Sequence, residues 1–190
     1  MSTTATPYTE PWLRGTHTDV PAAGRAVIHA LELSLDDLTK WTAGLTDAEV
    51  HSQPLGLTSI AFHLRHIARS VDRILTYAEG GQLSAEQLAA LKSEQNGTEQ
   101  SRTEQAESKQ GGEGNLESLA ELLAEVEVSY SDAADRIRVL ATADLNTSRF
   151  VGRKQLPTSI GGAMIHVADH TQRHTGQVVT TAKVIKMLRA

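Results

Sequence analysis

The stretch LESLAELLAEVEVSYSDAADRIRVL, residues 116–140, decides the fold class of this chain. Its apolar residues recur at alternating intervals of three and four, which places them on one face of an α-helix. These positions are Leu119, Leu123, Val126, Tyr130, Ala133, Ile137 and Leu140. Such a seam is typical of a helix in a bundle or coiled coil, and it predicts a long helix that begins near Leu116.

Three further segments show helical periodicity. A first helix is predicted over residues 21–44, and a second over residues 59–79, with Thr58 as its cap. A last helix is predicted from Thr158, with a seam that is apolar at both ends and polar in the middle. That seam runs through Ile160, Ala163, Val167, His170, His174, Gln177, Thr181, Val184 and Leu188.

The segments between the long helices are shorter or more polar. Thr46 and Glu49 form a capping box for a short helix. Ser84 opens a minor helix that ends near Leu91, and the polar stretch 146–157 is expected to be partly extended. These segments therefore connect the bundle helices and add little to the core.

Residues 92–115 contain no Val, Ile, Leu, Met or aromatic residue. A stretch that cannot bury apolar surface is expected to stay a mobile polar connection. It divides no domains, because neither half of the chain has enough helices to close a core alone. We therefore predict an N-terminal extension, 1–20, and one all-α four-helix bundle domain, 21–190, with the long polar connection between helices 2 and 3.

The composition excludes several classes of function. The 190 residues carry a net charge of −5 and no cysteine. Dispersed charge with an acidic excess offers no concentrated basic face for nucleic acid. No run of about eighteen apolar residues occurs, and residues 1–20 lack a signal peptide's pattern, so we expect a cytoplasmic protein without membrane contact. The absence of cysteine rules out a disulfide, a cysteine zinc site and a thiolate nucleophile.

Five of the eight histidines lie in two short windows, FHLRHI at 62–67 and HVADHTQRH at 166–174. His170 and His174 are one helical turn apart, so their imidazoles can share a metal ion. Burying imidazoles without partners would cost about 1 to 3 kcal/mol each, and coordination would compensate for that cost. A third ligand from the second helix, His63 or His66, would leave positions open for water or substrate. The alternative is a set of metal-free histidines that pack and hydrogen-bond.

Several other chemistries lack their motifs in this sequence. Thr171 follows His170, so the pair is not the HExxH arrangement of a metalloprotease. The glycine pairs at 111–112 and 161–162 lack the preceding strand and following Lys-Ser/Thr of a phosphate-binding loop. No GxSxG elbow of a serine hydrolase is present. Nucleotide hydrolysis and zincin-type proteolysis are therefore not expected.

The order SIAFHLRHIA at 59–68, followed by HVADHTQRHTGQVVTTAKV at 166–184, resembles the DinB/YfiT-like superfamily of bacterial four-helix bundle metalloproteins. In that family one His precedes an Ile or Leu on the second helix. Two more, four apart, precede an Arg-Gly-Gln on the last helix. Position by position, the resemblance implies His66, His170 and His174 as metal ligands, with Thr175 in place of the family's Arg.

Periodicity and resemblance favour different third ligands. His63 lies closer than His66 to the centre of the second helix's apolar stripe, so periodicity alone favours His63. The resemblance favours His66. His63, His166 and the retained Gln177 then become candidates for supporting the ligands or lining a pocket.

The resemblance implies a class of activity and not one particular reaction. Characterised relatives include thiol-dependent enzymes, such as bacillithiol S-transferases and mycothiol-dependent maleylpyruvate isomerases. We therefore expect a divalent metal, Zn or Ni before Mn or Fe, that activates a low-molecular-weight thiol for S-transferase chemistry on a small-molecule substrate. The resemblance also implies a homodimer. The alternatives are a metal-dependent hydrolase and a non-catalytic metal-binding stress-response bundle.

Overall fold

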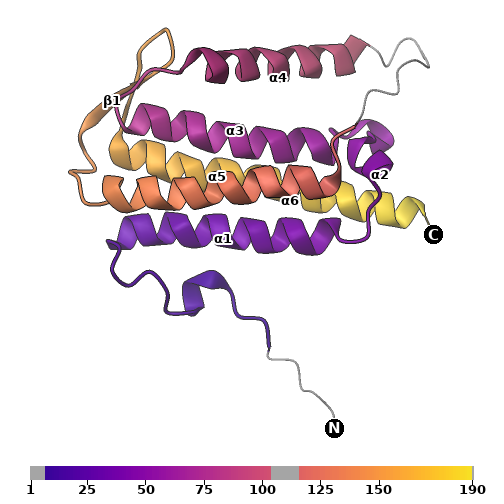
Figure 1. Ribbon diagram of the computed structural model, residues 1–190, viewed down its shortest axis with the longest axis horizontal. Helices are drawn as coiled ribbons and strands as arrows, with labels where there is room; N and C mark the ends of the chain where they lie inside the picture. The colour runs from indigo at the N-terminus through magenta and orange to yellow at the C-terminus, as the bar shows by residue number, and fades with distance from the viewer. Residues whose placement is uncertain (1–6, 104–115, 190) are drawn as a thin grey trace.

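A computed structural model of the chain describes residues 7–103 and 116–189, with 95–103 described by their backbone alone. Four long helices lie side by side and form the bundle (Figure 1). They are α1 (Ala22–Thr42), α3 (Ile60–Ala78), α5 (Leu119–Leu140) and α6 (Ile160–Leu188). The predicted all-α four-helix bundle is therefore confirmed.

The shorter elements lie around this bundle. They are η1 (Pro11–Leu13), α2 (Asp47–His51), η2 (Pro54–Gly56), α4 (Ala85–Thr103), β1 (Ser148–Val151) and β2 (Leu156–Ser159). The two strands pair in antiparallel fashion, which confirms the partly extended segment before α6. Figure 1 shows α4 along α3 on one side of the bundle, and η1 beyond α1 on the opposite side.

Hydroxyl side chains begin several of the helices. The predicted capping box of Thr46 and Glu49 is confirmed at the start of α2. The predicted start of α3 at Thr58 is wrong by one residue, because the hydroxyl of Ser59 accepts the N–H of Phe62 at 3.2 Å. In the same way Ser159, not Thr158, caps α6.

The polar connection after α3 differs most from its prediction. The minor helix does not end near Leu91, because α4 continues to Thr103, so residues 92–103 are helical. This part of α4 has little apolar surface, and polar contacts attach it to the bundle. The buried carboxylate of Glu94 pairs with Arg73 and His66 on α3. Residues 104–115, the rest of the predicted mobile connection, lie outside the described part of the chain.

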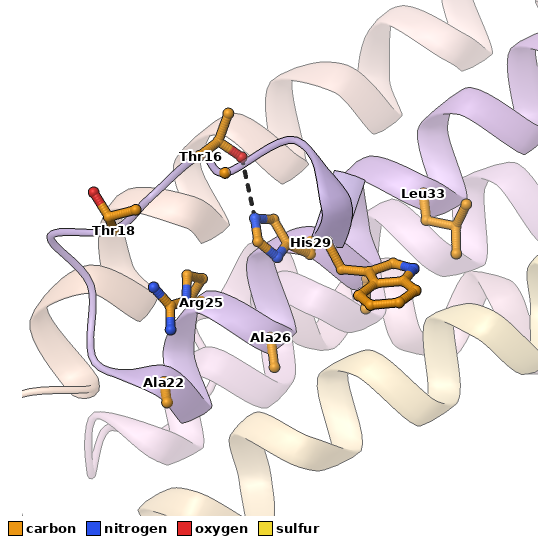
Figure 2. A pocket seen from close by; sticks show the side chains of 10 residues that line it. Thr16, Thr18, Ala22, Arg25, Ala26, His29 and Leu33 are labelled. Atoms are coloured by element: carbon orange, nitrogen blue, oxygen red, sulfur yellow. Dashed lines mark hydrogen bonds between the residues drawn. The ribbon is translucent and has the colours of Figure 1, made fainter. Parts of the chain in front are cut away.

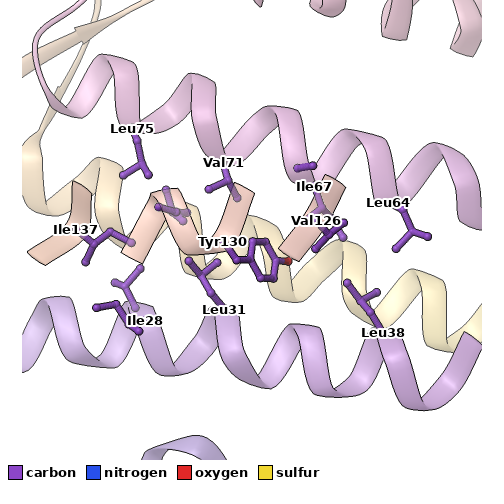
Figure 3. Close-up of a cluster of buried hydrophobic side chains, with 14 of the residues drawn as sticks. Ile28, Leu31, Leu38, Leu64, Ile67, Val71, Leu75, Val126, Tyr130 and Ile137 are labelled. Carbon is purple, nitrogen blue, oxygen red and sulfur yellow. The ribbon is translucent and has the colours of Figure 1, made fainter. Parts of the chain in front are cut away.

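The apolar core fills the space between the bundle helices. Figure 3 shows side chains of α1, α3 and α5 that converge there. Its labelled members are Ile28, Leu31, Leu38, Leu64, Ile67, Val71, Leu75, Val126, Tyr130 and Ile137. The predicted seam of α5 is confirmed from Val126 to Leu140, while Leu122 replaces Leu119 and Leu123 as its buried N-terminal member.

The predicted seam of α6 is wrong in its middle. The buried line passes through Thr171, Thr175 and Val178, and not through His170 and His174. A buried polar contact accompanies this orientation, because the Thr175 hydroxyl lies 2.7 Å from that of Ser34 on α1 and satisfies a polar group on the core side of α6. With Thr171 and Thr175 on the buried face of α6, His170 and His174 lie at the edge of the core.

None of the helices in the described residues is both long enough and apolar enough to cross a membrane.

Candidate metal centre

Three of the predicted site residues meet between α3 and α6. One ligand atom from each of His66, His170 and His174 lies within 4.8 Å of the others. The ring centroids are 4.6 Å apart for His170 and His174, 4.6 Å for His66 and His174, and 5.0 Å for His66 and His170. Nε2 of His66 and Nε2 of His170 are separated by 3.0 Å. This histidine cluster can hold a metal ion.

The orientation of His66 is set by a carboxylate. Nδ1 of His66 lies 2.9 Å from Oε2 of Glu94. Because a carboxylate accepts and does not donate, Nδ1 carries the proton and donates it to Glu94. A neutral His66 therefore keeps its lone pair on Nε2, the atom that faces His170. Metal-binding histidines in proteins are commonly held in this way by a carboxylate on the opposite ring nitrogen.

Glu94 is in turn held by an arginine. Arg73 donates to both carboxylate oxygens, with Nη1–Oε1 at 2.9 Å and Nη2–Oε2 at 3.0 Å. Both side chains are only 8% exposed. Burial alone would raise the pKa of the Glu94 carboxyl, but the hydrogen bonds from His66 and Arg73 outweigh it, and this pKa lies below its ordinary value. Glu94 is therefore charged at neutral pH.

His63 contacts the cluster from a second side. Its Nδ1 lies 3.1 Å from Nδ1 of His174, and the residue is 4% exposed. A neutral His174 that donates its Nδ1–H to His63 keeps the lone pair of Nε2 for the cluster. In the structure His63 therefore contacts a member of the cluster and lies outside the group of three.

His170 and His174 of the cluster, and the neighbouring His63, are poor bases in the metal-free protein. Burial, followed by the charge of neighbouring histidines, lowers the pKa of His63, His170 and His174 to about 4. At neutral pH these three imidazoles are therefore uncharged. Uncharged imidazole is the form that binds metal, so little proton competition has to be overcome.

The remaining predicted site residues lie at the margin of the cluster. The ring of His166 is 5.4 Å from that of His170, but its side chain is half exposed and its Nδ1 pairs with Asp169 at 2.9 Å. Gln177 is exposed and hydrogen-bonds His174. Thr175 is buried away from the cluster, where its hydroxyl bonds Ser34 and the carbonyl oxygen of Thr171.

A cleft adjoins the cluster beside His63. It has a volume of about 390 Å³, and its lining includes Thr58, Arg173, Gln177 and Thr180. The side chain of Arg173 is 59% exposed, and its contact with Asp169 is long, at 3.5 Å. The cleft therefore offers a cation and several hydrogen-bonding groups next to the histidines.

A second group of ligand-type side chains, His17, His29 and Glu32, also meets within 4.8 Å. Arg138 donates to Nδ1 of His17 at 2.7 Å, so a neutral His17 carries its proton on Nε2 and donates it to Glu32, also at 2.7 Å. Both ring nitrogens are thus used, and a guanidinium lies beside them. This arrangement favours a hydrogen-bonded anchor for the N-terminal segment over a cation site.

Glu94 and Arg73 are the site residues that the sequence analysis missed. Glu94 lies in the stretch assigned to a polar connection, 28 positions from its partner His66. Arg73 lies about two helical turns after His66, on the same side of α3, and this spacing is the signal in the sequence that could have identified it. An unpaired arginine on the core side of α3 requires a carboxylate, yet the sequence does not show which one.

The sequence matches a known protein family. The family described as the DinB superfamily matches residues 30–178. The matched range includes all three histidines of the cluster together with Glu94 and Arg73. No curated protein matches the chain.

Proposed function

The chain belongs to the DinB superfamily, and from this membership and the geometry of the cluster we propose that His66, His170 and His174 bind a divalent metal ion. The observation that carries the proposal is the direction of the His66 lone pair. The proton that His66 donates to Glu94 leaves its Nε2 lone pair 3.0 Å from Nε2 of His170. In the metal-free protein Nε2 of His170 can donate its proton to this lone pair, and a cation bound between the two nitrogens would take the place of that proton.

The ligand set favours Zn²⁺ or Ni²⁺ over Mn²⁺. Imidazole suits Zn, Cu, Fe and Ni, whereas Mn prefers oxygen ligands. Among the described residues the group contains three ligating side chains and no fourth. Three protein ligands with an open position is the pattern of catalytic metal sites, while structural sites are closed by four.

We propose that the protein uses this centre for thiol-dependent transfer to a small-molecule substrate. A divalent cation held there would lower the pKa of a bound thiol, as it does for bound water. The chain contains no cysteine, so the thiol comes from outside. Arg173 and Gln177 in the adjoining cleft would bind a polar or anionic part of the thiol or substrate.

Elemental analysis tests the metal proposal directly. Untagged protein, purified without added metal or chelator, would be compared with His170→Ala and with His51→Ala, which removes a histidine outside the cluster. We expect one Zn or Ni per chain in the native protein and in His51→Ala, and none in His170→Ala. Little metal in all three proteins after reconstitution with Zn, Ni, Mn and Fe would refute it.

Activity assays separate the candidate reactions. The loaded protein would be tested with low-molecular-weight thiols and an electrophilic acceptor, and in parallel with ester and amide substrates. Turnover that requires a thiol and disappears in His170→Ala supports the transferase. Hydrolysis of the ester or amide without thiol would identify the protein as a hydrolase instead of a transferase. Full metal loading with neither thiol transfer nor hydrolysis would favour the non-catalytic bundle.

A further inference from the structure

A second cavity lies between the N-terminal segment and α1, and none of the three cluster histidines lines it. Its volume is about 480 Å³, within the range of small-molecule sites. Side chains that line it include Trp12, Thr16, Thr18, Arg25, His29 and Leu33. Figure 2 shows Arg25, His29 and the two threonines around this space, with Ala22 and Ala26 along the helix.

The charge of this cavity is positive. Of the described residues that line it, Arg25 is the only arginine or lysine, and none is Asp or Glu. Arg25 is half-buried, and within the described residues its guanidinium has no ion-pair or hydrogen-bond partner. The buried Arg73 and the half-buried Arg136, in contrast, pair with carboxylates. A partly desolvated guanidinium without a counter-ion is a binding group for an anion.

One side of the cavity is apolar and flat. Trp12 is 61% exposed although the bundle core is close by, and Leu33 lies in the same lining. The indole N–H donates to Glu10 at 2.7 Å, which fixes the edge of the ring. Alanines 22, 26 and 30 form the floor on α1 and leave room for a ring. An exposed indole beside an arginine suits an aromatic anion.

The wall opposite α1 is held in place before any ligand arrives. His17 has φ +56°, a backbone conformation that non-glycine residues seldom adopt. Its side chain is fixed by Arg138 and Glu32, and the hydroxyl of Thr16 lies 3.1 Å from Nε2 of His29. A loop ordered in this way loses little freedom on binding, which favours affinity for a small molecule.

We propose that this cavity binds a small aromatic carboxylate, with the carboxylate paired to Arg25 and the ring against Trp12 and Leu33. The site is independent of the proposed metal centre, because it is formed by the N-terminal segment and α1, whereas the histidine cluster lies between α3 and α6. Thr16 and Thr18 would donate further hydrogen bonds to the carboxylate.

The test uses 2-naphthoate and its uncharged amide as probes, with chelator-treated full-length protein so that no metal can bind the carboxylate. Binding would be followed by calorimetry and by NMR shifts of the Thr16 and His29 amides. We expect saturable binding of 2-naphthoate, weakened about tenfold or more by Arg25→Gln, with little change for the amide. Ala26→Leu, which fills the floor from an exposed helical position, would weaken both probes.

Arg153→Gln is the matched control, because it removes an exposed arginine of the β1–β2 turn and should leave both affinities unchanged. The circular dichroism spectrum and urea midpoint of Arg25→Gln, compared with those of the native protein, show whether the bundle is intact. Absence of saturable 2-naphthoate binding, equal affinity for the amide, or no effect of Arg25→Gln would each overturn the proposal. None of these outcomes bears on the metal centre.

Discussion

Glu94 on α4 accepts a hydrogen bond from His66 on α3, with 2.9 Å between Oε2 and Nδ1. The same carboxylate receives two hydrogen bonds from Arg73. One buried side chain therefore attaches α4 to the bundle and also sets which nitrogen of His66 is free to bind a metal. Helix α4 is thus part of the candidate site as well as a connection between α3 and α5.

Replacing this carboxylate should weaken the metal centre. In Glu94→Gln the charge that stabilises the Nδ1–H of His66 and balances Arg73 is lost. Loss of such a supporting partner lowers metal affinity about 10- to 100-fold in known sites. Competition with a chromophoric chelator would measure the affinity. Glu86→Gln, an exposed position on the same helix, is the control, and equal affinity in all three proteins would show that Glu94 does not support the centre.

The bundle could be predicted from sequence because its signal is local. Apolar residues three and four apart, as from Val126 to Leu140, define a helix and its buried face without knowledge of any partner. The cap positions have a weaker local signal, because Thr58 and Ser59 are adjacent and either hydroxyl can cap a helix. Only the backbone path shows that Ser59 accepts the N–H of Phe62.

The candidate site could be predicted only in part. His170 and His174 are one turn apart, so their proximity follows from helix geometry. The choice between His63 and His66 depends on the rotation of α3 against α6, which periodicity does not fix to better than about one side chain. The structure places both near the cluster, His66 within the group of three and His63 beside His174. The contact with Glu94 is long-range and leaves no local pattern.

The metal-free protein should lose stability on acidification. The pKa of His63, His170 and His174 is about 4 in the folded protein and 6.5 in the unfolded chain. Between these values the unfolded chain binds more protons, so the free energy of unfolding falls as the pH decreases from 6.5 to 4. Below about pH 4 the folded protein is protonated as well, and these groups contribute no further loss.

Urea unfolding of chelator-treated protein across this pH range would measure the effect. His170→Gln lacks one of the three groups, so its stability should fall less steeply with acidification than that of the native protein. Parallel curves for the two proteins would contradict the assignment of the titration to the cluster.

Two helical glycines should respond to alanine in opposite directions. A Cβ on Gly24 of α1 would lie 2.5 Å from Cβ of Ala141 and 3.2 Å from Cγ1 of Val20. We expect Gly24→Ala to destabilise the protein by about 1 to 3 kcal/mol, because the clash exceeds the gain in helix propensity of about 1 kcal/mol. Around Gly176 of α6 nothing lies within 4 Å of the added Cβ, so Gly176→Ala should stabilise by about 0.5 to 1 kcal/mol.

Denaturant unfolding of the metal-free variants would test this pair. Both substitutions add the same methyl group inside an α-helix, so the difference between them isolates the contact between α1 and the end of α5. Stabilisation by Gly24→Ala would mean that Ala141 can move away at no cost.

Single substitutions of the two histidines on α3 should separate a ligand from its support. His66→Ala removes one of three nitrogens that converge within 4.8 Å, so we expect loss of stoichiometric metal. His63→Ala leaves those three nitrogens in place and removes only the contact with Nδ1 of His174. It should therefore retain one metal per chain with an affinity about 10-fold or more below that of the native protein. Metal content and chelator competition on both variants measure this difference, and the reverse pattern would identify His63 as the third ligand.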